Sequence, residues 1–362
     1  MNDHTDILIA GGGVAGITAA AALARDATLR LLERETHLAS HASGRSAAMF
    51  LPAYGNGAVR ALNEASAEAH HHLDGGVLSP RGLMVIARAG KEDAFADQAA
   101  RMGLAAIDLA EAQAKLPILR ADLIARAGWQ AAAWDLDTDL LIQNAARRAK
   151  AAGAELRTGA EITGISRANG RWQVTAGAKM FTADILVNAS GAWADGLASL
   201  AGVAPLGLQP MRRSMAQLPA PEGHDIANWP FTEEITERWY ARPAGGRWVV
   251  SPSEEDPVPA MDAWADDMVL AEGLARYEDM VTAPVTRVET SWAGLRTFAP
   301  DRSLVIGRAS DHPAFFWLAG QGGYGFQTAP AAARLTADLI AGRPAELDAA
   351  TTAALAPARF AA

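Results

Sequence analysis

The segment 6–33 constrains the fold of this chain more than any other. It reads as an apolar strand, a glycine-rich turn from Gly11 to Gly16, an alanine-rich helix, a second strand and an acid, Glu33. In a G-x-G-x-x-G turn the first glycine permits the tight turn, the second lets the backbone approach a pyrophosphate, and the third lets helix and strand pack closely. Glu33 stands where a ribose-binding acid belongs. The segment predicts a dinucleotide-binding βαβ unit, and the turn alone does not choose between FAD and NAD.

The composition narrows the class of protein. With 362 residues and a net charge of −9, the chain is long enough for two domains and does not favour nucleic-acid binding. It has no cysteine, which excludes disulfides, cysteine-ligated metals and a cysteinyl flavin link. We see no signal-peptide pattern and no apolar run of about 18 residues. We therefore expect a cytoplasmic protein without a transmembrane helix, and contact with a membrane surface stays open.

Strand and helix signals alternate along the chain, which favours an α/β architecture. We expect helices over 138–152 and 328–340, a hairpin of 161–167 with 171–175 around Asn169-Gly170, and strands over 155–158, 181–188, 303–306 and 315–319. Dinucleotide-domain features thus appear at the start, the middle and the end of the chain. We assign 1–78, 141–207 and 297–362 to a dinucleotide-binding domain, and 79–140 and 208–296 to a second domain inserted twice into the first.

Two polar clusters are interpreted as surface features. Histidines 70–72 are expected to form a solvated helix end, because adjacent helical residues do not share one face as metal ligands must. Asp135, Asp137 and Asp139 are expected near a helix N-terminus, where acids complement the helix dipole. No metal site is predicted.

Five segments together resemble the FAD-dependent D-amino acid oxidase superfamily, and within it the D-arginine dehydrogenase-like enzymes. Beside the Gly11–Gly16 turn with Glu33, they are Ser43-Gly-Arg-Ser-Ala-Ala48 with Tyr54-Gly55, Leu206-Gly-Leu-Gln-Pro-Met-Arg-Arg-Ser214, Ser291-Trp-Ala-Gly-Leu-Arg-Thr-Phe298 and Gln321-Gly-Gly-Tyr-Gly-Phe-Gln-Thr328. The resemblance covers essentially the whole chain. It implies a Rossmann-like FAD-binding domain of the GR2 type, a discontinuous substrate domain built on a mixed β-sheet, and oxidation of an amine by hydride transfer to the flavin.

The expected cofactor is therefore FAD, held without a covalent link. A link through His41 is the less favoured alternative to a polar loop residue. The Gly322-Gly323 loop opens a helix, so its N–H groups would stabilise negative charge on a reduced flavin. The positions expected to hold the cofactor are Gly11, Gly13, Val14, Ala15, Gly16, Glu33, Arg34, Arg45, Ser46, Ala47, Ala48, Ile162, Gly191, Trp193, Gly322, Gly323, Tyr324, Gly325 and Gln327.

Arg213 and Arg296 are the candidates for holding a substrate carboxylate, because a guanidinium fork offers two parallel charge-assisted hydrogen bonds. For each, the alternative is a surface arginine or an internal salt bridge. Arg212 is adjacent to Arg213 and would point elsewhere on a strand. The resemblance places the hydroxyls of Tyr54 and Tyr240 at the substrate carboxylate or in the pocket wall.

Two departures from the pattern change the expected substrate. D-arginine dehydrogenase-like enzymes carry a histidine after Ser-Ala-Ala, where this chain has Met49, and an acid two residues after the arginine of Ser-Pro-Arg, where it has Leu83. These residues would contribute to an apolar pocket, so we expect a preference for neutral or hydrophobic D-amino acids. Glu233 could face the same pocket and restore affinity for a cation. The set expected at the substrate is Arg213, Arg296, Tyr54, Tyr240, Gly323, Met49, Leu51, Leu83 and Phe231.

The expected function is that of an FAD-dependent D-amino acid dehydrogenase, which yields a 2-oxo acid and ammonia and passes electrons to an acceptor other than oxygen. Some amine oxidases of the superfamily place a lysine near flavin N5, whereas the four lysines of this chain lie outside the flavin segments. The alternatives are an amine or N-methyl amino acid oxidase that uses oxygen, and an FAD-carrying subunit of an electron-transfer complex. An NAD(P)-dependent enzyme is less favoured, because it would leave the C-terminal Gly-Gly-Tyr-Gly segment without a role.

Overall fold

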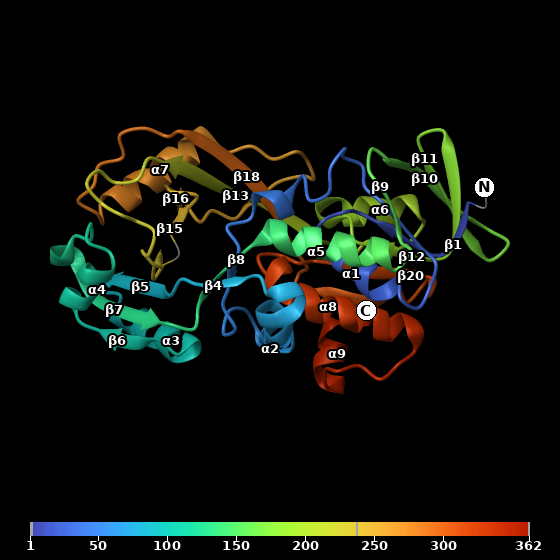
Figure 1. The fold of residues 1–362 in the computed structure, drawn as a ribbon, viewed down its shortest axis with the longest axis horizontal. Coiled ribbons are helices and arrows are strands. Elements are labelled where there is room, and N and C mark those ends of the chain that lie inside the picture. The colour runs from blue at the N-terminus through green and yellow to red at the C-terminus, as the bar shows by residue number, and fades with distance from the viewer. Residues whose placement is uncertain (1–2, 237, 361–362) are drawn as a thin grey trace.

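The computed structural model describes residues 3–236 and 238–360, and in it two sheets lie at opposite ends of an elongated molecule (Figure 1). The sequence assigns residues 1–2 and 361–362 to the dinucleotide-binding domain, and these lie outside the described residues. The alternation of strands and helices confirms the α/β class. None of the helices within the described ranges has the length and apolar character needed to cross a membrane.

The first sheet contains the glycine-rich turn. Its parallel strands run in the order β20 (Phe315–Ala319), β12 (Lys179–Asn188), β1 (His4–Ala10), β2 (Leu29–Leu32) and β9 (Glu155–Arg157). The antiparallel strand β19 (Val305–Arg308) borders β20, and the expected hairpin of β10 (Ile162–Ala168) with β11 (Arg171–Ala176) pairs with β12. Strands β2 and β20 are buried throughout and β1 over most of its length, as expected for a parallel sheet with both faces covered.

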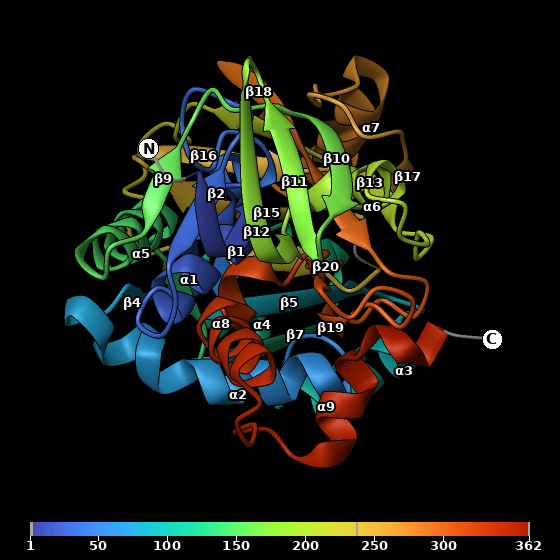
Figure 2. The same cartoon turned by 90° about the vertical axis from the view of Figure 1, so that its right-hand side faces the viewer.

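Helices cover both faces of this sheet (Figure 2). Helix α1 (Val14–Leu23) packs between α5 (Thr138–Ala151) and α8 (Gly325–Ala341), and its alanines permit close approach. Helix α2 (Gly57–His72) packs on α8 and on α9 (Ala349–Leu355), whereas α6 (Ala194–Leu200) belongs to the core on the other face. The short helical turns are Ala42–Arg45, Leu73–Gly75, Ala121–Leu123, Gly191–Trp193 and Pro357–Phe360.

The second sheet is mixed. Its order is β17 (Asp256–Pro257), β13 (Gln209–Leu218), β16 (Arg247–Ser251), β15 (Tyr240–Ala244), β14 (Phe231–Glu234), β5 (Leu83–Arg88), β7 (Ile124–Gln130) and β6 (Ala105–Ile107), with β18 (Thr290–Phe298) also paired to β13. Within it β14 and β5 run parallel and the other neighbours antiparallel. The helices of this part are α3 (Glu92–Met102), α4 (Leu109–Lys115) and α7 (Asp267–Glu278).

A small sheet of β3 (Met49–Phe50), β8 (Trp134–Leu136) and β4 (Leu78–Pro80) lies at the junction of the two parts. We propose that the two large sheets are the cores of the two domains expected from the sequence. Helix α5 begins at Thr138 and packs on α1, so we place the junction before this helix rather than at residue 141.

Two expectations about local structure are wrong. Helix α8 begins at Gly325 rather than at residue 328, so Gln327 belongs to its first turn. The histidines 70–72 are not all solvated, because α2 packs against α8 and buries His70, whose Nε2 donates to the Gln327 carbonyl at 2.8 Å. Only His72 of the three is exposed.

The acidic cluster is near a helix N-terminus as expected. Asp137 is the N-cap of α5 and accepts a hydrogen bond from the Leu140 amide at 2.8 Å, and Asp139 lies in the first turn. Asp135 lies in β8 and instead pairs with Arg81 at 2.6 Å.

Candidate cofactor and substrate site

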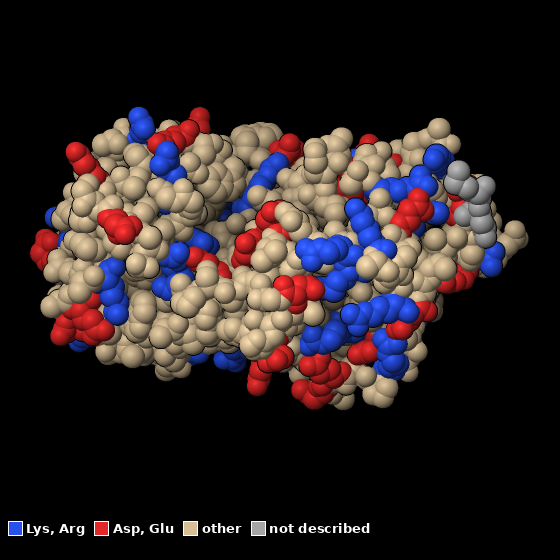
Figure 3. Space-filling view, in the orientation of Figure 1, with Lys and Arg blue, Asp and Glu red and all other residues tan. Residues whose placement is uncertain are grey.

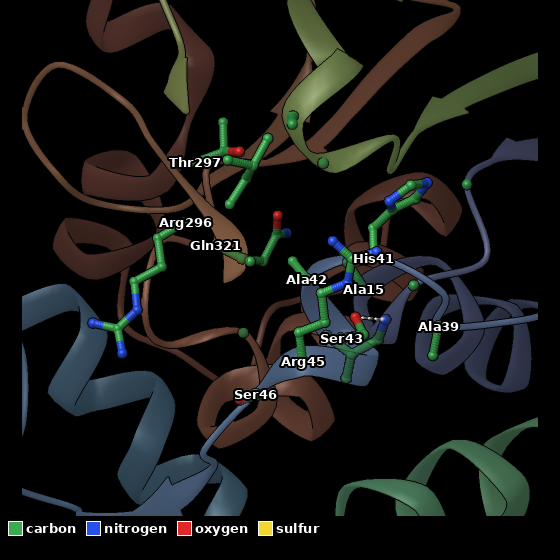
Figure 4. A pocket seen from close by; sticks show the side chains of 18 of the residues that line it. Ala15, Ala39, His41, Ala42, Ser43, Arg45, Ser46, Arg296, Thr297 and Gln321 are labelled. Atoms are coloured by element: carbon green, nitrogen blue, oxygen red, sulfur yellow. Dashed lines mark hydrogen bonds between the residues drawn. The ribbon is translucent and has the colours of Figure 1, made fainter. Parts of the chain in front are cut away.

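A cavity of about 460 Å³ extends from the glycine-rich turn of the first sheet to the face of the second sheet. Its walls come from the ends of β1, β2 and β12, the start of α1, the loop before β3, the strands β13, β14, β15 and β18, and the start of α8. In Figure 4, Arg296 lies at one side of the cavity and His41 at the other, with Gln321 between them. The cavity therefore has two ends, one formed by each sheet.

The glycine-rich turn is held by backbone packing. Gly11 has φ +106°, and a Cβ atom there would collide with the Ala189 carbonyl oxygen. A Cβ atom at Gly16 would collide with the Gly11 carbonyl, so this glycine lets α1 approach the end of β1. The Val14 amide in the first turn of α1 donates to Ser43 Oγ at 3.0 Å. The start of α1, with its amide groups and positive dipole end, therefore forms part of the cavity wall.

Glu33 is fixed at the end of β2 by backbone donors. Its Oε2 accepts a hydrogen bond from the Gly12 amide at 2.6 Å, and its Oε1 accepts one from the Glu35 amide at 2.8 Å. The side chain lines the cavity although it is nearly buried. This is the placement expected of a ribose-binding acid.

Aromatic and charged side chains gather at the Glu33 end of the cavity. The guanidinium of Arg34 lies 4.3 Å from the centre of the Trp193 ring, and the ring of His41 lies 4.8 Å from it. His41 Nε2 is 2.8 Å from a carboxylate oxygen of Glu35, and hydrogen bonds from His41 and Arg34 lower the pKa of Glu35. His41 thus lies in a polar network on the side of the cavity away from Arg296, and this placement is compatible with a cofactor held without a link to this residue.

Arg45 connects the loop before β3 to the second domain. It donates to the carbonyls of Ala263 and Ala293 at 2.7 and 3.0 Å and pairs with Asp262 at 2.5 Å. The hydrogen bond from Arg45 lowers the pKa of Asp262. Sequence analysis did not identify the segment around Ala263, which lines the cavity from a long loop.

At the other end, the register of β13 with β18 decides which arginines face the cavity. Met211 pairs with Arg296 and Arg213 pairs with Gly294, so Arg213 and Arg296 lie on one face of the sheet. Arg212 points to the other face, where it pairs with Asp256 at 3.3 Å and Asp266 at 3.5 Å. The expectation that Arg212 points elsewhere is confirmed.

Arg213 and Arg296 differ in what surrounds their guanidinium groups. Arg213 donates to the Glu254 carbonyl at 2.8 Å and pairs with Glu255 at 3.2 Å, so its charge is partly neutralised. Arg296 lies beside Gly323, where a Cβ atom would come within 3.1 Å of its Nη1. Within the described part of the chain, no residue forms an ion pair with Arg296. This arginine therefore offers its charge to the cavity.

Tyr54 and Tyr240 line the same cavity as Arg296. Burial opposes its charged form, but Tyr240, Tyr54 and then Glu255 favour it, and the pKa of Arg296 is raised. Tyr240 stacks on Phe231 with ring centres 5.0 Å apart and donates to Met215 Sδ at 3.2 Å. A guanidinium in this setting stays charged at any physiological pH and suits a carboxylate.

The wall beside Tyr240 is largely apolar. Met49, Leu51 and Phe231 line the cavity, as expected. Leu83 packs behind them in the same hydrophobic cluster without reaching the cavity surface, so its expected contact with substrate is not supported. Glu233 does line the cavity.

A largely buried arginine that sequence analysis missed holds part of this wall. Arg242 of β15 donates to the Ala47 and Ala48 carbonyls and pairs with Asp135 at 2.7 Å. Burial is the largest influence on its pKa, which is lowered. Ala47 and Ala48 line the cavity, so Arg242 ties this loop to the strand that carries Tyr240.

The structure brings almost every predicted site residue to this one cavity. The exceptions are Leu83, Gly16, which packs against Gly11, and Tyr324, which lies behind Tyr54 with ring centres 5.4 Å apart. Lining residues that sequence analysis missed include Ser43, Met215, Met261, Thr297 and Gln321. Met215 could have been found from its spacing of two residues from Arg213 on one strand.

The cavity fits a polar dinucleotide. Among the described residues, the buried atoms Thr297 Oγ1, Gln321 Nε2 and His41 Nδ1 lack a hydrogen-bond partner, and all three residues line it. Buried polar atoms normally find partners, so these atoms favour an occupant with polar groups. The start of α1 would hold a pyrophosphate, Glu33 a ribose, and the start of α8 the negative edge of a reduced flavin.

Comparison with known proteins decides the family. The family model described as "DAO: FAD dependent oxidoreductase" matches residues 6–339. The chain belongs to this family. FAD is therefore its cofactor, and the glycine, acid and loop positions described above agree with that assignment.

Among curated proteins, this family member is 30% identical to the tRNA 5-methylaminomethyl-2-thiouridine biosynthesis bifunctional protein MnmC of Thiobacillus denitrificans, over 98% of this chain and 59% of that protein. It is 26% identical to FAD-dependent oxidoreductase domain-containing protein 1 of Xenopus laevis, over 43% of this chain and 34% of that protein. The chain thus spans less than two thirds of the length of each of these relatives.

Solved structures share the whole fold. L-proline dehydrogenase from P. horikoshii gives a TM-score of 0.86 at 22% identity, covering 100% of this chain and 99% of that one. Glycine oxidase from Geobacillus kaustophilus gives a TM-score of 0.82 at 22% identity, covering 96% of this chain and 98% of that one. Iminodiacetate oxidase from Chelativorans sp. BNC1 gives a TM-score of 0.80 at 22% identity, covering 94% of this chain and 97% of that one. These likenesses confirm the expected fold class. Closeness to D-arginine dehydrogenase-like enzymes is not shown by them.

Proposed function

We propose that this FAD-dependent oxidoreductase oxidises α-amino acids, D-enantiomers foremost, to imino acids that hydrolyse to 2-oxo acids and ammonia. One observation carries the proposal: Arg296 presents a charged guanidinium to the cavity beside Gly323, and Tyr54 and Tyr240 line the same cavity. A substrate carboxylate is the natural partner for such a group.

FAD, when bound, supplies the two-electron oxidant. Arg296 holds the substrate carboxylate, and Tyr54 and Tyr240 shape the pocket around it. Positioning of this kind contributes much of the rate in reactions that need an aligned C–H bond. The substrate amine must be neutral when its α-hydrogen leaves, and Met49 cannot accept a proton, so we assign that proton to solvent.

We propose an electron acceptor other than oxygen. The lysines of this chain are at 91, 115, 150 and 179, the structure describes all four, and none of them lines the cavity. The cavity therefore offers no lysine ammonium group that could promote the reaction of reduced flavin with oxygen.

A second candidate is oxidation of a secondary amino acid. The printed names of three proteins with the same fold mention proline, glycine and iminodiacetate, and proline and iminodiacetate carry a secondary amine. Arg296 would hold the carboxylate of such a substrate equally well.

Anaerobic bleaching of the flavin tests both candidates. The purified yellow protein is mixed with D-, L- and N-methyl amino acids without oxygen, and the visible absorbance is followed. The proposal is supported if D-amino acids bleach the flavin and the visible absorbance returns only slowly in air. Faster bleaching by N-methyl amino acids, with absorbance that returns quickly in air, would favour the second candidate. If no amino acid bleaches the flavin, both candidate functions are contradicted.

A further inference from the structure

Building on the proposed function, we infer that Glu255 and Arg302 form a positioning pair that sets how strongly Arg213 holds a substrate carboxylate. Arg213 lines the cavity, and the pair lies behind it. Glu255 is shared by the two arginines, so its negative charge is divided between them. The pair adjusts a positive charge at the substrate end of the cavity without contacting the substrate.

Strand register brings Glu255 next to Arg213. Strand β17 runs antiparallel to β13 with Asp256 opposite Arg212, so the residue before Asp256 lies beside the residue after Arg212. Nε of Arg213 donates to the Glu254 carbonyl at 2.8 Å, and its Nη2 donates to Oε1 of Glu255 at 3.2 Å. The acid is therefore held against Arg213 by the sheet and by the backbone of its neighbour.

A second arginine reaches Glu255 from the loop between β18 and β19. Nη2 of Arg302 donates to both carboxylate oxygens of Glu255, at 3.0 and 2.8 Å. Oε1 is thus shared, because it also accepts the hydrogen bond from Arg213. The side chain of Arg213 is 11% exposed and that of Arg302 is 46% exposed, with Glu255 intermediate at 32%. The arginine nearer to solvent therefore neutralises part of the charge that otherwise acts on the arginine of the cavity.

Both members of the pair come from strained turns. Arg302 has φ +62°, and Ser253, two residues before Glu255, has φ +57°. Positive φ is unfavourable for a residue with a side chain, and such strain persists where the surrounding structure or the function requires it. The Arg302 guanidinium also lies 3.8 Å from the centre of the Phe298 ring, which fixes its place. Its contact with Glu255 gives a reason for an arginine at a position where glycine would relieve the strain.

The neighbouring acid has different surroundings. The Glu254 carboxylate accepts a hydrogen bond from the Ser214 amide at 2.5 Å, and burial raises the pKa of Glu254. Burial thus works against the charge of Glu254, whereas Glu255 holds its charge between two arginines. Glu255 weakens the attraction of Arg213 for a carboxylate, and Arg302 weakens that effect of Glu255. Substitution of the acid and of the outer arginine should therefore change carboxylate binding in opposite directions.

Binding of hexanoate to the FAD-loaded protein tests the inference without oxidation. Hexanoate has a carboxylate but no α-amino group, and its binding is followed as a change in the visible absorbance of the flavin. We expect Glu255→Gln to tighten binding by about fivefold, because Arg213 regains its full charge. Arg302→Gln should weaken binding by about threefold, because the Glu255 charge then acts on Arg213 alone. Arg302→Lys keeps the cation and should bind hexanoate nearly as the wild-type protein does.

The double variant distinguishes a positioning pair from two structural residues. In the Glu255→Gln background, Arg302→Gln should change hexanoate binding by less than about 1.5-fold, because Arg302 acts through Glu255. Glu346→Gln, which breaks an exposed ion pair with Arg334, is the control and should leave binding unchanged. Weaker binding in Glu255→Gln would overturn the inference. So would an equal loss from Arg302→Gln with and without the Glu255 carboxylate.

These outcomes do not depend on turnover. Opposite shifts in hexanoate binding support the inference even if no amino acid bleaches the flavin, in which case the proposed function alone fails. Equal binding by the wild-type protein and both single variants contradicts the inference, even if D-amino acids are good substrates. A wild-type protein that does not bind hexanoate also contradicts it, because Arg213 then holds no carboxylate. Hexanamide carries no charge, and opposite shifts with this amide would show that the effect is not electrostatic and would refute the inference.

Discussion

The two ends of the cavity use different parts of the chain. At the dinucleotide end, the shape comes from backbone: Gly11 and Gly16 permit close packing, and amides of Gly12 and Glu35 fix Glu33. At the substrate end, the shape comes from side chains such as those of Arg296 and Tyr240, which belong to strands that are distant in sequence. We therefore expect larger side chains at the glycines to damage the dinucleotide end. At the substrate end, we expect the removal of functional side-chain groups to have the larger effect.

The cavity, not the outer surface, carries the distinguishing features of this molecule. On the face seen in Figure 3, acidic and basic side chains are intermixed over both domains. The charges of Arg296, Arg213 and Glu233 instead converge inside the cavity. Changes there should affect substrate and cofactor separately, and the predictions below test that separation from the largest expected effect to the smallest.

Loss of the Arg296 guanidinium should affect the substrate end alone. We expect Arg296→Met to lower kcat/KM for a D-amino acid by about 10³-fold, because the carboxylate loses its charged partner and its alignment. Bound FAD, measured from the visible absorbance, should stay near the wild-type level. Arg287→Met, at an exposed position ahead of β18, serves as the control and should change neither quantity. Loss of FAD in Arg296→Met would show that the two ends are not separable.

Added volume at Gly11 should affect the dinucleotide end first. Gly11→Ala requires a positive φ of +106° at alanine and a collision with the Ala189 carbonyl. We expect loss of bound FAD and a fall of about 3 kcal/mol in the free energy of unfolding, measured by denaturant titration. Gly57→Ala in the first turn of α2 meets no atom within 4 Å and is the matched control. Full FAD content in Gly11→Ala would contradict the packing argument.

Protonation of His70 should weaken the fold below neutral pH. Burial lowers the pKa of His70 to about 4 from its ordinary value of 6.5, so the folded state binds fewer protons than the unfolded state between these values. Stability is complete above about pH 6.5 and is lost as the pH falls toward 4, by up to about 3 kcal/mol. Denaturant titrations from pH 7 to pH 4 measure this slope.

The contribution of His70 is isolated by substitution. His70→Gln should flatten the slope between pH 6.5 and 4, whereas His72→Gln, at an exposed position of the same helix, should leave it unchanged. An unchanged slope in His70→Gln would assign the pH dependence to other groups. Since His70 bonds to the carbonyl of Gln327, a residue that lines the cavity, we also expect the spectrum of bound flavin to change as the pH falls to about 4, where His70 of the folded protein takes up its proton.

Neutralising Glu33 should give the smallest effect. Glu33→Gln keeps an acceptor for the Gly12 amide but removes the charge that we assign to a ribose. We expect FAD affinity to fall by about tenfold, as for the loss of one charge-assisted hydrogen bond. Equilibrium dialysis of FAD against Glu33→Gln and against the exposed control Glu64→Gln measures the difference. An effect on kcat at saturating FAD would contradict a role confined to the dinucleotide end.

The dinucleotide end could be predicted from sequence because its determinants are local. Gly11, Gly16 and Glu33 lie within one βαβ unit, and the steric reasons for the glycines hold in any such unit. The same is true of α5 and of the hairpin at Asn169-Gly170, whose signals are contained in a few consecutive residues.

The substrate end could be predicted only in part. Arg296 could be predicted because it lies in a recognisable segment. The partial neutralisation of the Arg213 charge could not, because it depends on Glu254 and Glu255, about forty residues from Arg213 along the chain. Leu83 was expected in the cavity wall and instead packs behind it, because the register of β14 with β5 is not encoded in any short motif. His70 was taken for a surface residue because its burial depends on α8, far along the chain.

The central claim is that Arg296 recognises the carboxylate of an amino acid in the cavity that also holds FAD. The most direct test compares D-norleucine with D-norleucinamide, which replaces the carboxylate by a neutral amide and leaves the rest of the substrate intact. The rate of anaerobic flavin bleaching per unit concentration should be about 10³-fold higher for the acid in the wild-type protein, and nearly equal for the two in Arg296→Met. Equal rates for acid and amide in the wild-type protein would contradict the claim.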